Sequence, residues 1–529
     1  MLSLLSSDGY KQCHHRLYPS NLEYMYSNTT PRSSRVDGVN EVVVFGTQYF
    51  VEEYLINNWN ETFFSQPIEI VLAEYHRIID NYLGPGIIND ENIRYLHNLG
   101  YLPIRLKALK EGSFCPIGVP LMTIINTDPK CVWLTNFLET ISQTVTWLPI
   151  TSATTAYNFR KLLNRFAEET SDCPELVTWQ AHDFSMRGMS SFESCGVSGM
   201  GHLLSFTGTD SIPAICFAEK YYGADITKEL IGGSVFASEH SIQQTYFDEK
   251  LDNEDRYIQA MLDAVRKGIV SIVSDGYDYW KLISENLIKF RDAILARDGK
   301  VVIRPDSGDP VKVVTGYFYK EIDYKSTTFK NIIKSQSGFM EIWDDDHDAI
   351  KTADGKYFDI NGEELTENEV KGSIQILYEI FGGTKNSKGY IQLDPHIGLI
   401  YGDSITHARC KEICERLKQK GFASTNVVYG IGSYTYQYVT RDTFSLACKA
   451  TWVQVGGVAK SIFKSPKTGG GGKKSAKGLL RVNRVGGKLV LQEDCTPEEE
   501  KGGELITIFE DGKQFNKVTL SEIRQRLSV

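Results

Sequence analysis

Lys300-Val-Val-Ile-Arg-Pro-Asp-Ser-Gly-Asp-Pro310 is the stretch around which the rest of this 529-residue chain is best interpreted. Its apolar run, Val301 to Ile303, is typical of a short buried strand. Pro305 ends that strand because proline has no N–H to donate to a sheet, so Arg304 and Asp306 lie where the strand gives way to a loop. A cation and a carboxylate fixed there suit a substrate that carries phosphate and a metal ion. A surface salt bridge beside a turn is the alternative explanation.

The same arrangement, a short apolar run followed by polar residues and then a helix, recurs after residue 177. Seven such units predict an α/β fold with a parallel β/α barrel and functional groups at the carboxyl ends of its strands. A doubly wound open sheet is the competing architecture. We expect this domain to span residues 177–442. The predicted strands are 178–181, 204–206, 235–237, 270–273, 301–303, 397–401 and 426–429.

The composition limits the classes of function. The chain has 41% hydrophobic residues, 23% charged residues and a formal net charge of −10, as in a globular protein of two or three domains. This balance implies neither a nucleic-acid partner nor an anionic membrane partner, so clusters of arginine and lysine must bind any anionic substrate. No apolar run is long enough to span a membrane, and residues 1–8 do not resemble a signal peptide.

The ten cysteines show no CxxC pattern. They predict reduced, mostly buried thiols in a cytoplasmic protein and argue against a structural zinc site.

The two ends of the chain differ from the barrel in their patterns. Residues 1–176 mix strands, such as 103–109 and 121–126, with helices at 133–146 and 161–169. Residues 443–529 are rich in predicted hairpins and end on a helix at 520–527. We expect this C-terminal segment to pack with the N-terminal segment in a β-rich domain.

Two further segments stand out. An insertion at about 340–380 lies in a polar region whose turns at Asp354-Gly355 and Asn361-Gly362 predict a hairpin, and its acidic run, 344–348, is expected to be a solvated face. Thr468 to Lys474 contains four consecutive glycines beside lysines. Such a loop either closes over an anionic ligand or is a flexible surface connection.

The polar residues at the predicted strand ends form a chemically coherent set. Glycine turns offer backbone N–H groups to phosphate, and carboxylates beside them can hold Mg²⁺. Phe184 and Tyr10 add flat apolar faces. The set therefore suits a phosphorylated, metal-bound substrate together with an aromatic ring. It comprises Arg187, Arg304, Asp210, Asp275, Asp306, Asp403, His240 and the glycines 402, 430 and 432.

Ordered motifs over nearly the whole chain, outside the 340–380 insertion, carry a resemblance to a known family. They are 8–11 (DGYK), 126–129 (NTDP), 133–136 (WLTN), 182–184 (HDF), 187–188 (RG), 208–210 (GTD), 239–241 (EHS), 273–275 (VSD), 304–308 (RPDSG), 402–403 (GD) and 440–442 (TRD). With them the chain resembles the nicotinamide phosphoribosyltransferases. The resemblance implies an α/β barrel joined to a β-rich domain built from both chain ends, and a homodimer with shared active sites.

The resemblance also implies the reaction and the residues. Nicotinamide and phosphoribosyl pyrophosphate would give nicotinamide mononucleotide and pyrophosphate, with Mg²⁺ as cofactor and ATP as co-substrate. Phe184 and the partner subunit's Tyr10 would sandwich the pyridine ring, and Asp210 would accept a hydrogen bond from the carboxamide. Arg304 and Ser271 would lie in the same pocket. Phosphate groups would be bound by Arg32, Arg187, Arg441, Lys464, Gly402, Asp403, Gly432 and Ser433.

The remaining implied roles are catalytic. Asp306 would serve the ribose and metal region, and Asp275 and Arg304 would also be catalytic. His240 would be phosphorylated transiently by ATP. The glycine-rich turn departs from the family pattern, because Ser433 and Tyr434 add bulk where backbone should approach the 5′-phosphate. Two alternatives stay open at this point: a nicotinate phosphoribosyltransferase, and a non-catalytic binding protein on the same fold.

Overall fold

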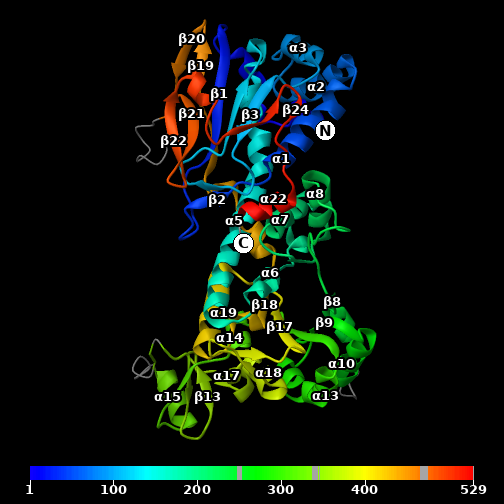
Figure 1. Cartoon of the computed structure of the whole chain (residues 1–529), viewed down its shortest axis with the longest axis vertical. Helices are drawn as coiled ribbons and strands as arrows, with labels where there is room; N and C mark the ends of the chain where they lie inside the picture. The colour runs from blue at the N-terminus through cyan, green and yellow to red at the C-terminus, as the bar shows by residue number, and fades with distance from the viewer. Residues whose placement is uncertain (247–252, 336–342, 345, 465–474, 528–529) are drawn as a thin grey trace.

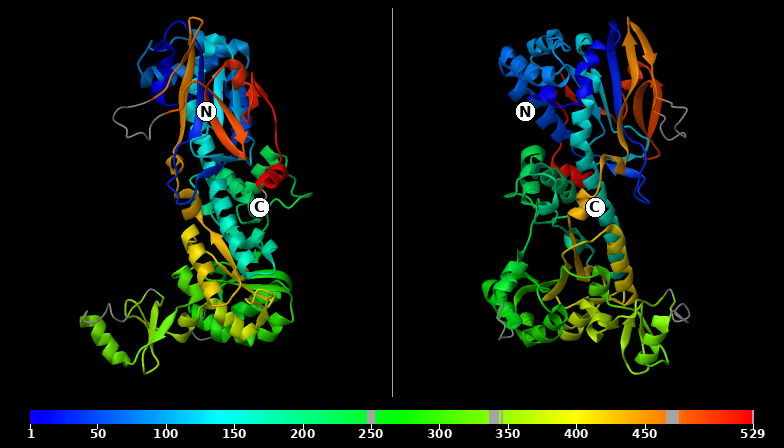
Figure 2. Two further views of the ribbon diagram at one scale, coloured as in Figure 1. Left: turned by 60° about the vertical axis from the view of Figure 1, so that its left-hand side comes forward. Right: turned by 180° about the vertical axis from the view of Figure 1, so that it is seen from behind.

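The computed structural model describes residues 1–246, 253–335, 343–344, 346–464 and 475–527. The molecule is elongated, with an antiparallel sheet in one lobe, a parallel sheet in the other, and the long helix α5 (Glu139–Thr170) running between them (Figure 1). The insertion projects from the lobe that holds the parallel sheet (Figure 2). In the described part of the chain, no helix combines the length and the apolarity needed to cross a membrane.

The antiparallel sheet is built from both ends of the chain. Its order is β20-β19-β1-β5-β3-β23-β24, so N-terminal β1 pairs with C-terminal β19 and N-terminal β3 pairs with C-terminal β23. The predicted β-rich domain is therefore confirmed. Its strands are β1 (Leu22–Pro31), β3 (Ile104–Ala108), β5 (Met122–Asn126), β19 (Leu446–Val455), β20 (Val458–Ser461), β23 (Ile506–Glu510) and β24 (Lys513–Gln514).

The parallel sheet contains the seven predicted units. Its order is β7-β6-β18-β17-β10-β9-β8. From β8 at one edge to β18 the strands follow the order of the chain, and β6 and then β7 complete the sheet at the other edge. The edge strands β7 and β8 are thus consecutive in sequence, as in a barrel left open between them. The predicted barrel-like α/β fold is confirmed. Its strands are β6 (Ala181–Asp183), β7 (Gly208–Thr209), β8 (Phe236–Ala237), β9 (Lys267–Val273), β10 (Asp298–Arg304), β17 (Ile397–Tyr401) and β18 (Val427–Ile431).

Helices cover the parallel sheet and link it to the other lobe. α7 packs on both α5 and α8, and α14 packs on α18 and α19. The C-terminal helix α22 donates from Arg524 to the carbonyls of Leu203, Leu230 and Ile231, which holds the chain end against the α7 region. The helices are α7 (Phe192–Leu203), α8 (Ile212–Tyr222), α9 (His240–Thr245), α14 (Pro310–Thr315), α18 (Ser373–Phe381), α19 (His407–Gln419), α20 (Ser433–Gln437) and α22 (Leu520–Leu527).

The prediction of two separate helices at 133–146 and 161–169 was wrong, because the single helix α5 also includes the residues between them. Pro149 lies inside it, and proline normally interrupts a helix. Here its ring packs against Gly46, where any side chain would collide with it. Residues 145–153 contribute to the buried core of the antiparallel lobe and residues 156–167 to that of the parallel lobe. Since one helix serves both cores, the boundaries at residues 176 and 442 stay a prediction.

Two strand predictions were also displaced. Residues 178–181 are mostly helix, because α6 (Val177–Gln180) precedes β6, and residues 204–206 lie before β7 and not within it. β10 matches its pattern: Val301 and Ile303 are fully buried, whereas Lys300, Val302 and Arg304 line a cavity on the other face. The period of two along the strand thus delivers Arg304 to that cavity.

The insertion forms its own four-stranded sheet, β11 (Tyr319–Glu321), β12 (Ala349–Lys351), β13 (Tyr357–Asp359) and β14 (Glu364–Leu365). The predicted hairpin is confirmed, with Gly355 and Gly362 in left-handed turns at φ 80° and 81°. The expected solvated face is wrong for Asp348, which accepts hydrogen bonds from Lys312 and Arg416. These contacts tie the insertion to α14 and α19. The glycine loop, Thr468 to Lys474, lies outside the described residues, and all ten cysteines are free thiols.

Candidate active site

Four of the predicted residues line one cavity that extends along the parallel sheet to the carboxyl ends of its strands. The cavity holds about 330 Å³ and is lined by Phe184, Asp210, Ser271 and Arg304. Phe184 and Asp210 follow β6 and β7, Ser271 lies within β9, and Arg304 ends β10. Because the sheet is curled, side chains more than a hundred residues apart in the chain face the same space.

Asp210 is held by two donors on one of its oxygens. His182 Nε2 lies 2.9 Å from Asp210 Oδ1, and Ser234 Oγ donates to the same oxygen. Burial would raise the pKa of Asp210, but the hydrogen bonds from His182 and Ser234 and the charge of Arg304 hold that pKa below its usual range. The cavity therefore presents an ionised carboxylate at neutral pH.

A second histidine–aspartate pair lies at the same edge of the sheet. His240 Nε2 is 2.9 Å from Asp275 Oδ1, and Asp275 Oδ2 accepts the backbone N–H of Asp306 at 2.9 Å. Burial would raise the pKa of Asp275, but hydrogen bonds from Ser307, Asp306 and His240 hold that pKa below its usual range. Since an ionised carboxylate only accepts, His240 Nε2 carries the proton. Nδ1 of His240 has no hydrogen-bond partner among the described residues.

Asp306 fits a divalent cation bound partly by substrate. Its Oδ1 is buried without a hydrogen-bond partner in the described residues, and Arg304 Nε lies 3.7 Å away. A Cβ at Gly402 would stand 1.8 Å from Oδ1, so only glycine leaves room for this carboxylate. No three His, Cys, Asp or Glu side chains of the described chain form a complete metal site. One or two carboxylates completed by phosphates and water are what Mg²⁺ prefers.

The predicted phosphate-binding turn lies beside this region. Gly432 lies between β18 and α20, and a Cβ added to it would lie 3.6 Å from Asp403 Oδ1. A side chain at Gly188 would clash with Ser433, so the exposed Arg187 and Ser433 belong to one rim. The ring of Tyr434 is 57% exposed and stacks on Tyr438 at 4.9 Å, on the outside of the turn.

The other predicted binding residues belong to the antiparallel lobe. Tyr10 is 62% exposed and contacts Asp8 and His14 of its own segment. Arg32 N donates to Phe444 O, so the segments that contain Arg32 and Arg441 lie side by side. Lys464 is exposed just after β20. In the part of the chain that the structure describes, none of these four lines the cavity of Asp210 and Arg304.

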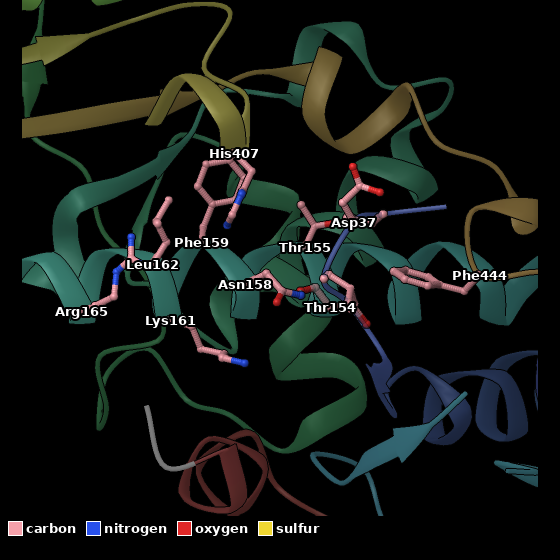
Figure 3. Close-up of a pocket in the computed structure, with 13 residues that line it drawn as sticks. Asp37, Thr154, Thr155, Asn158, Phe159, Lys161, Leu162, Arg165, His407 and Phe444 are labelled. Carbon is pink, nitrogen blue, oxygen red and sulfur yellow. The ribbon is translucent and has the colours of Figure 1, made fainter. Parts of the chain in front are cut away.

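A separate cavity of about 360 Å³ lies on one side of α5 (Figure 3). The loop Val36–Val39, His407 and Phe444 enclose it together with Lys161 and Arg165 of α5. None of the predicted catalytic or nicotinamide-binding residues is among those that line it. We therefore place the candidate site at the strand ends.

His182 and Ser234 are the site residues that the sequence interpretation missed. His182 was noted only as part of the motif around Phe184. Its position two residues before that aromatic, at the end of a strand, was the available signal. Ser234 lies in the segment Gly232-Gly-Ser before β8, where nothing in the sequence connects it with Asp210.

The comparisons with known proteins agree with this geometry. The model of the "Nicotinate phosphoribosyltransferase (NAPRTase) family" matches residues 179–512, and that of the "Nicotinamide phosphoribosyltransferase, N-terminal domain" matches residues 3–104. The "Nicotinamide phosphoribosyltransferase" of Acinetobacter baylyi is 43% identical over 98% of this chain and 96% of its own length. That of Xanthomonas campestris pv. campestris is 30% identical over 98% and 97%.

A solved structure shares the fold. The "nicotinate-nucleotide pyrophosphorylase from Pyrococcus furiosus" has a TM-score of 0.51 at 12% identity, and the match covers 99% of this chain and 95% of that one. Together with the matches above, the fold and the site define a phosphoribosyltransferase, an enzyme that transfers a pentosyl group. The chain belongs to the nicotinate phosphoribosyltransferase family. The resemblance to the nicotinamide phosphoribosyltransferases that the sequence motifs predicted is confirmed by the match to the N-terminal domain model and by the two relatives of that name.

Proposed function

We propose that this chain transfers the phosphoribosyl group of phosphoribosyl pyrophosphate to nicotinamide in NAD biosynthesis. The names of the relatives with 43% and 30% identity support nicotinamide as the base. The observation that carries the proposal is the ionised Asp210 in a cavity lined also by Phe184 and Arg304. A carboxylate accepts an N–H from a carboxamide but repels the negative charge of nicotinate.

The reaction joins the pyridine nitrogen to C1 of the ribose while the bond from C1 to the pyrophosphate oxygen breaks. The sugar passes through an oxocarbenium-like state, in which the ring gains positive charge and the leaving group gains negative charge. We assign the stabilisation of the positive ring to Asp306 and that of the negative leaving group to Arg187, with Asp275 acting through His240 and Asp306. The pyridinium product is a cation, and it stacks favourably on Phe184.

Mg²⁺ bound at Asp306, with substrate phosphates and water as its other ligands, would neutralise pyrophosphate charge. Burial, together with Asp275 and Asp403, raises the pKa of Asp306 against the opposing effect of Arg304 and His240. A buried carboxylate of this kind gains from a bound cation, which replaces the solvation that it lost.

His240 is suited to accept a phosphoryl group from ATP. Asp275 fixes the proton on Nε2, which leaves the lone pair of Nδ1 as the nucleophile. The side chain of His240 is 40% exposed whereas that of Asp275 is 4% exposed, so the imidazole is the accessible member of the pair. We therefore assign the transient phosphorylation to Nδ1 of His240, with its hydrolysis coupled to synthesis.

A homodimer would complete the site. Tyr10 presents an exposed ring, and Arg32, Arg441 and Lys464 lie on the lobe opposite the cavity. A second copy can bring these groups to the first copy's strand ends, where a second aromatic face and phosphate-binding cations are needed. This arrangement, and the cytoplasmic location predicted from the cysteines, are part of the proposal.

The test is a product assay on the purified enzyme with phosphoribosyl pyrophosphate, Mg²⁺ and either nicotinamide or nicotinate, with and without ATP. We expect nicotinamide mononucleotide as the preferred product and a higher yield with ATP. We also expect an acid-labile phosphoprotein with labelled ATP that disappears in His240→Gln. A preference for nicotinate would establish the alternative base, and no product from either base would favour a non-catalytic role.

A further inference from the structure

We propose that His182 is a positioning residue that sets the preference for nicotinamide over nicotinate by fixing the orientation of the Asp210 carboxylate. The proposal rests on the function proposed above, in which Asp210 accepts the carboxamide. It adds a residue that does not touch the base through its own polar atoms but determines what Asp210 offers to it.

The two carboxylate oxygens of Asp210 have different surroundings. Both donors, His182 Nε2 at 2.9 Å and Ser234 Oγ, bind Oδ1. Oδ2 has no hydrogen-bond partner among the described residues and is left for a ligand. The backbone N–H of Asp210 donates to Asp183 O at 2.9 Å, so the residue is anchored at its backbone as well as at Oδ1.

His182 is itself held in place. Its side chain is 10% exposed, and its ring lies 4.6 Å from that of Phe184 at 42°. In the parallel pairing of β6 with β7, His182 stands opposite Gly208. A Cβ at Gly208 would be 2.8 Å from Nδ1, so the glycine provides the space in which the imidazole lies.

Without the hydrogen bond from His182, the Asp210 carboxylate would have Arg304 as an alternative partner. Arg304 is close enough for its charge to lower the pKa of Asp210, and it lines the same cavity. A carboxylate released from His182 would be drawn toward the guanidinium. It would then offer less to the carboxamide, and the paired charges would repel nicotinate less. Selectivity would fall from both directions.

The experiment compares kcat/KM for nicotinamide and for nicotinate in four variants of the full-length enzyme. In His182→Leu and in Gly208→Ala, which displaces the ring without touching Asp210, we expect the ratio to fall about tenfold or more. The fall should come mainly from a higher KM for nicotinamide. KM for phosphoribosyl pyrophosphate should change less than about twofold. His182→Gln keeps an N–H donor and should recover most of the ratio. Asp210→Asn is the reference.

The control is His407→Leu, the same exchange at a histidine of the other cavity, which should leave the ratio unchanged. A ratio kept in His182→Leu and Gly208→Ala, while Asp210→Asn narrows it, would overturn the role of His182 and leave the proposed function standing. A ratio kept in Asp210→Asn would instead overturn the role of Asp210. Loss of both activities in equal proportion would also count against the proposal. If His182→Leu fails to fold, Gly208→Ala and His182→Gln decide.

Discussion

Two histidine–aspartate pairs lie beside the two edge strands of the parallel sheet. Their hydrogen bonds are equally long, but opposite members of the two pairs are buried. Each has an Nε2 to Oδ1 distance of 2.9 Å. In the pair of His182 and Asp210 the side chains are 10% and 44% exposed. In the pair of His240 and Asp275 they are 40% and 4% exposed. One pair therefore presents a carboxylate to ligands and the other presents an imidazole.

The strand order gives the reason. Each pair joins an edge strand to its inner neighbour, β7 to β6 at one end and β8 to β9 at the other. His182 lies in the inner strand β6 and Asp275 follows the inner strand β9, and both side chains are mostly buried. Asp210 and His240 follow the edge strands and stay accessible. The same two residue types thus serve base recognition at one end of the sheet and phosphoryl transfer at the other, according to which member follows the edge strand.

The largest effect is expected from Asp275→Asn. An amide in place of the carboxylate can donate to His240 Nε2, which moves the imidazole proton to Nδ1 and removes the nucleophilic lone pair. We expect the ATP-stimulated rate to fall by about 10⁴-fold, the order found when a histidine loses its orienting aspartate. Initial rates with saturating nicotinamide, with and without ATP, measure this.

The matched control is Asp278→Asn, three residues away. Asp278 caps α11 (Tyr279–Lys281) by accepting from Lys281 N at 3.0 Å, and asparagine caps equally well. It should keep nearly the full rate. If Asp275→Asn keeps its ATP stimulation, the two pairs do not differ in function as their burial suggests.

The sequence alone could predict those features of the molecule that depend on local signals. The strand predicted at 397–401 and the helix predicted at 520–527 agree with β17 and α22, because short apolar runs and helical periodicity are local signals. Arg304, Asp275 and Asp306 were predicted as site residues for the same reason, since each lies in the polar segment that follows a predicted apolar strand. The division of α5 into two helices was wrong, because one continuous helix with Pro149 inside it contributes to both cores.

The partnership of His182 and Ser234 with Asp210 could not be predicted in that way. It depends on β6 and β7 lying side by side and on Ser234 returning to the same edge, which are facts of tertiary structure. The roles of Tyr10 and Arg32 are further removed, because within one chain they lie on the other lobe. Only the resemblance to a family connected them with the site, and they stay a prediction.

A second prediction concerns Asp306, which touches the His240 pair but not the His182 pair. Its pKa is raised chiefly by burial, so it takes up a proton at a higher pH than an ordinary aspartate does. The protonated form cannot bind Mg²⁺, so the apparent Mg²⁺ affinity should fall as pH decreases, and the fall should begin at a higher pH than it would for an ordinary aspartate. Mg²⁺ titrations of the initial rate at several pH values measure this.

In Asp306→Asn the affinity should be lower at every pH and the dependence on pH should largely disappear. The ratio between nicotinamide and nicotinate should not follow this pH profile, because the pKa of Asp210 is lowered and Asp210 stays ionised over the same range. Parallel pH curves in the wild type and in Asp306→Asn would contradict the assignment of the cation to this carboxylate.

The smallest expected effect is that of Ser234→Ala, which removes one of the two donors to Asp210 Oδ1 and leaves His182 Nε2 in place. We expect the nicotinamide-to-nicotinate ratio of kcat/KM to fall only about two- to threefold, as for one hydrogen bond among several. In the background of His182→Leu, Ser234 is the remaining donor, so the same exchange should cost more. Such non-additivity is expected of groups that act on one atom. Equal effects in both backgrounds would mean that the two residues position Asp210 independently.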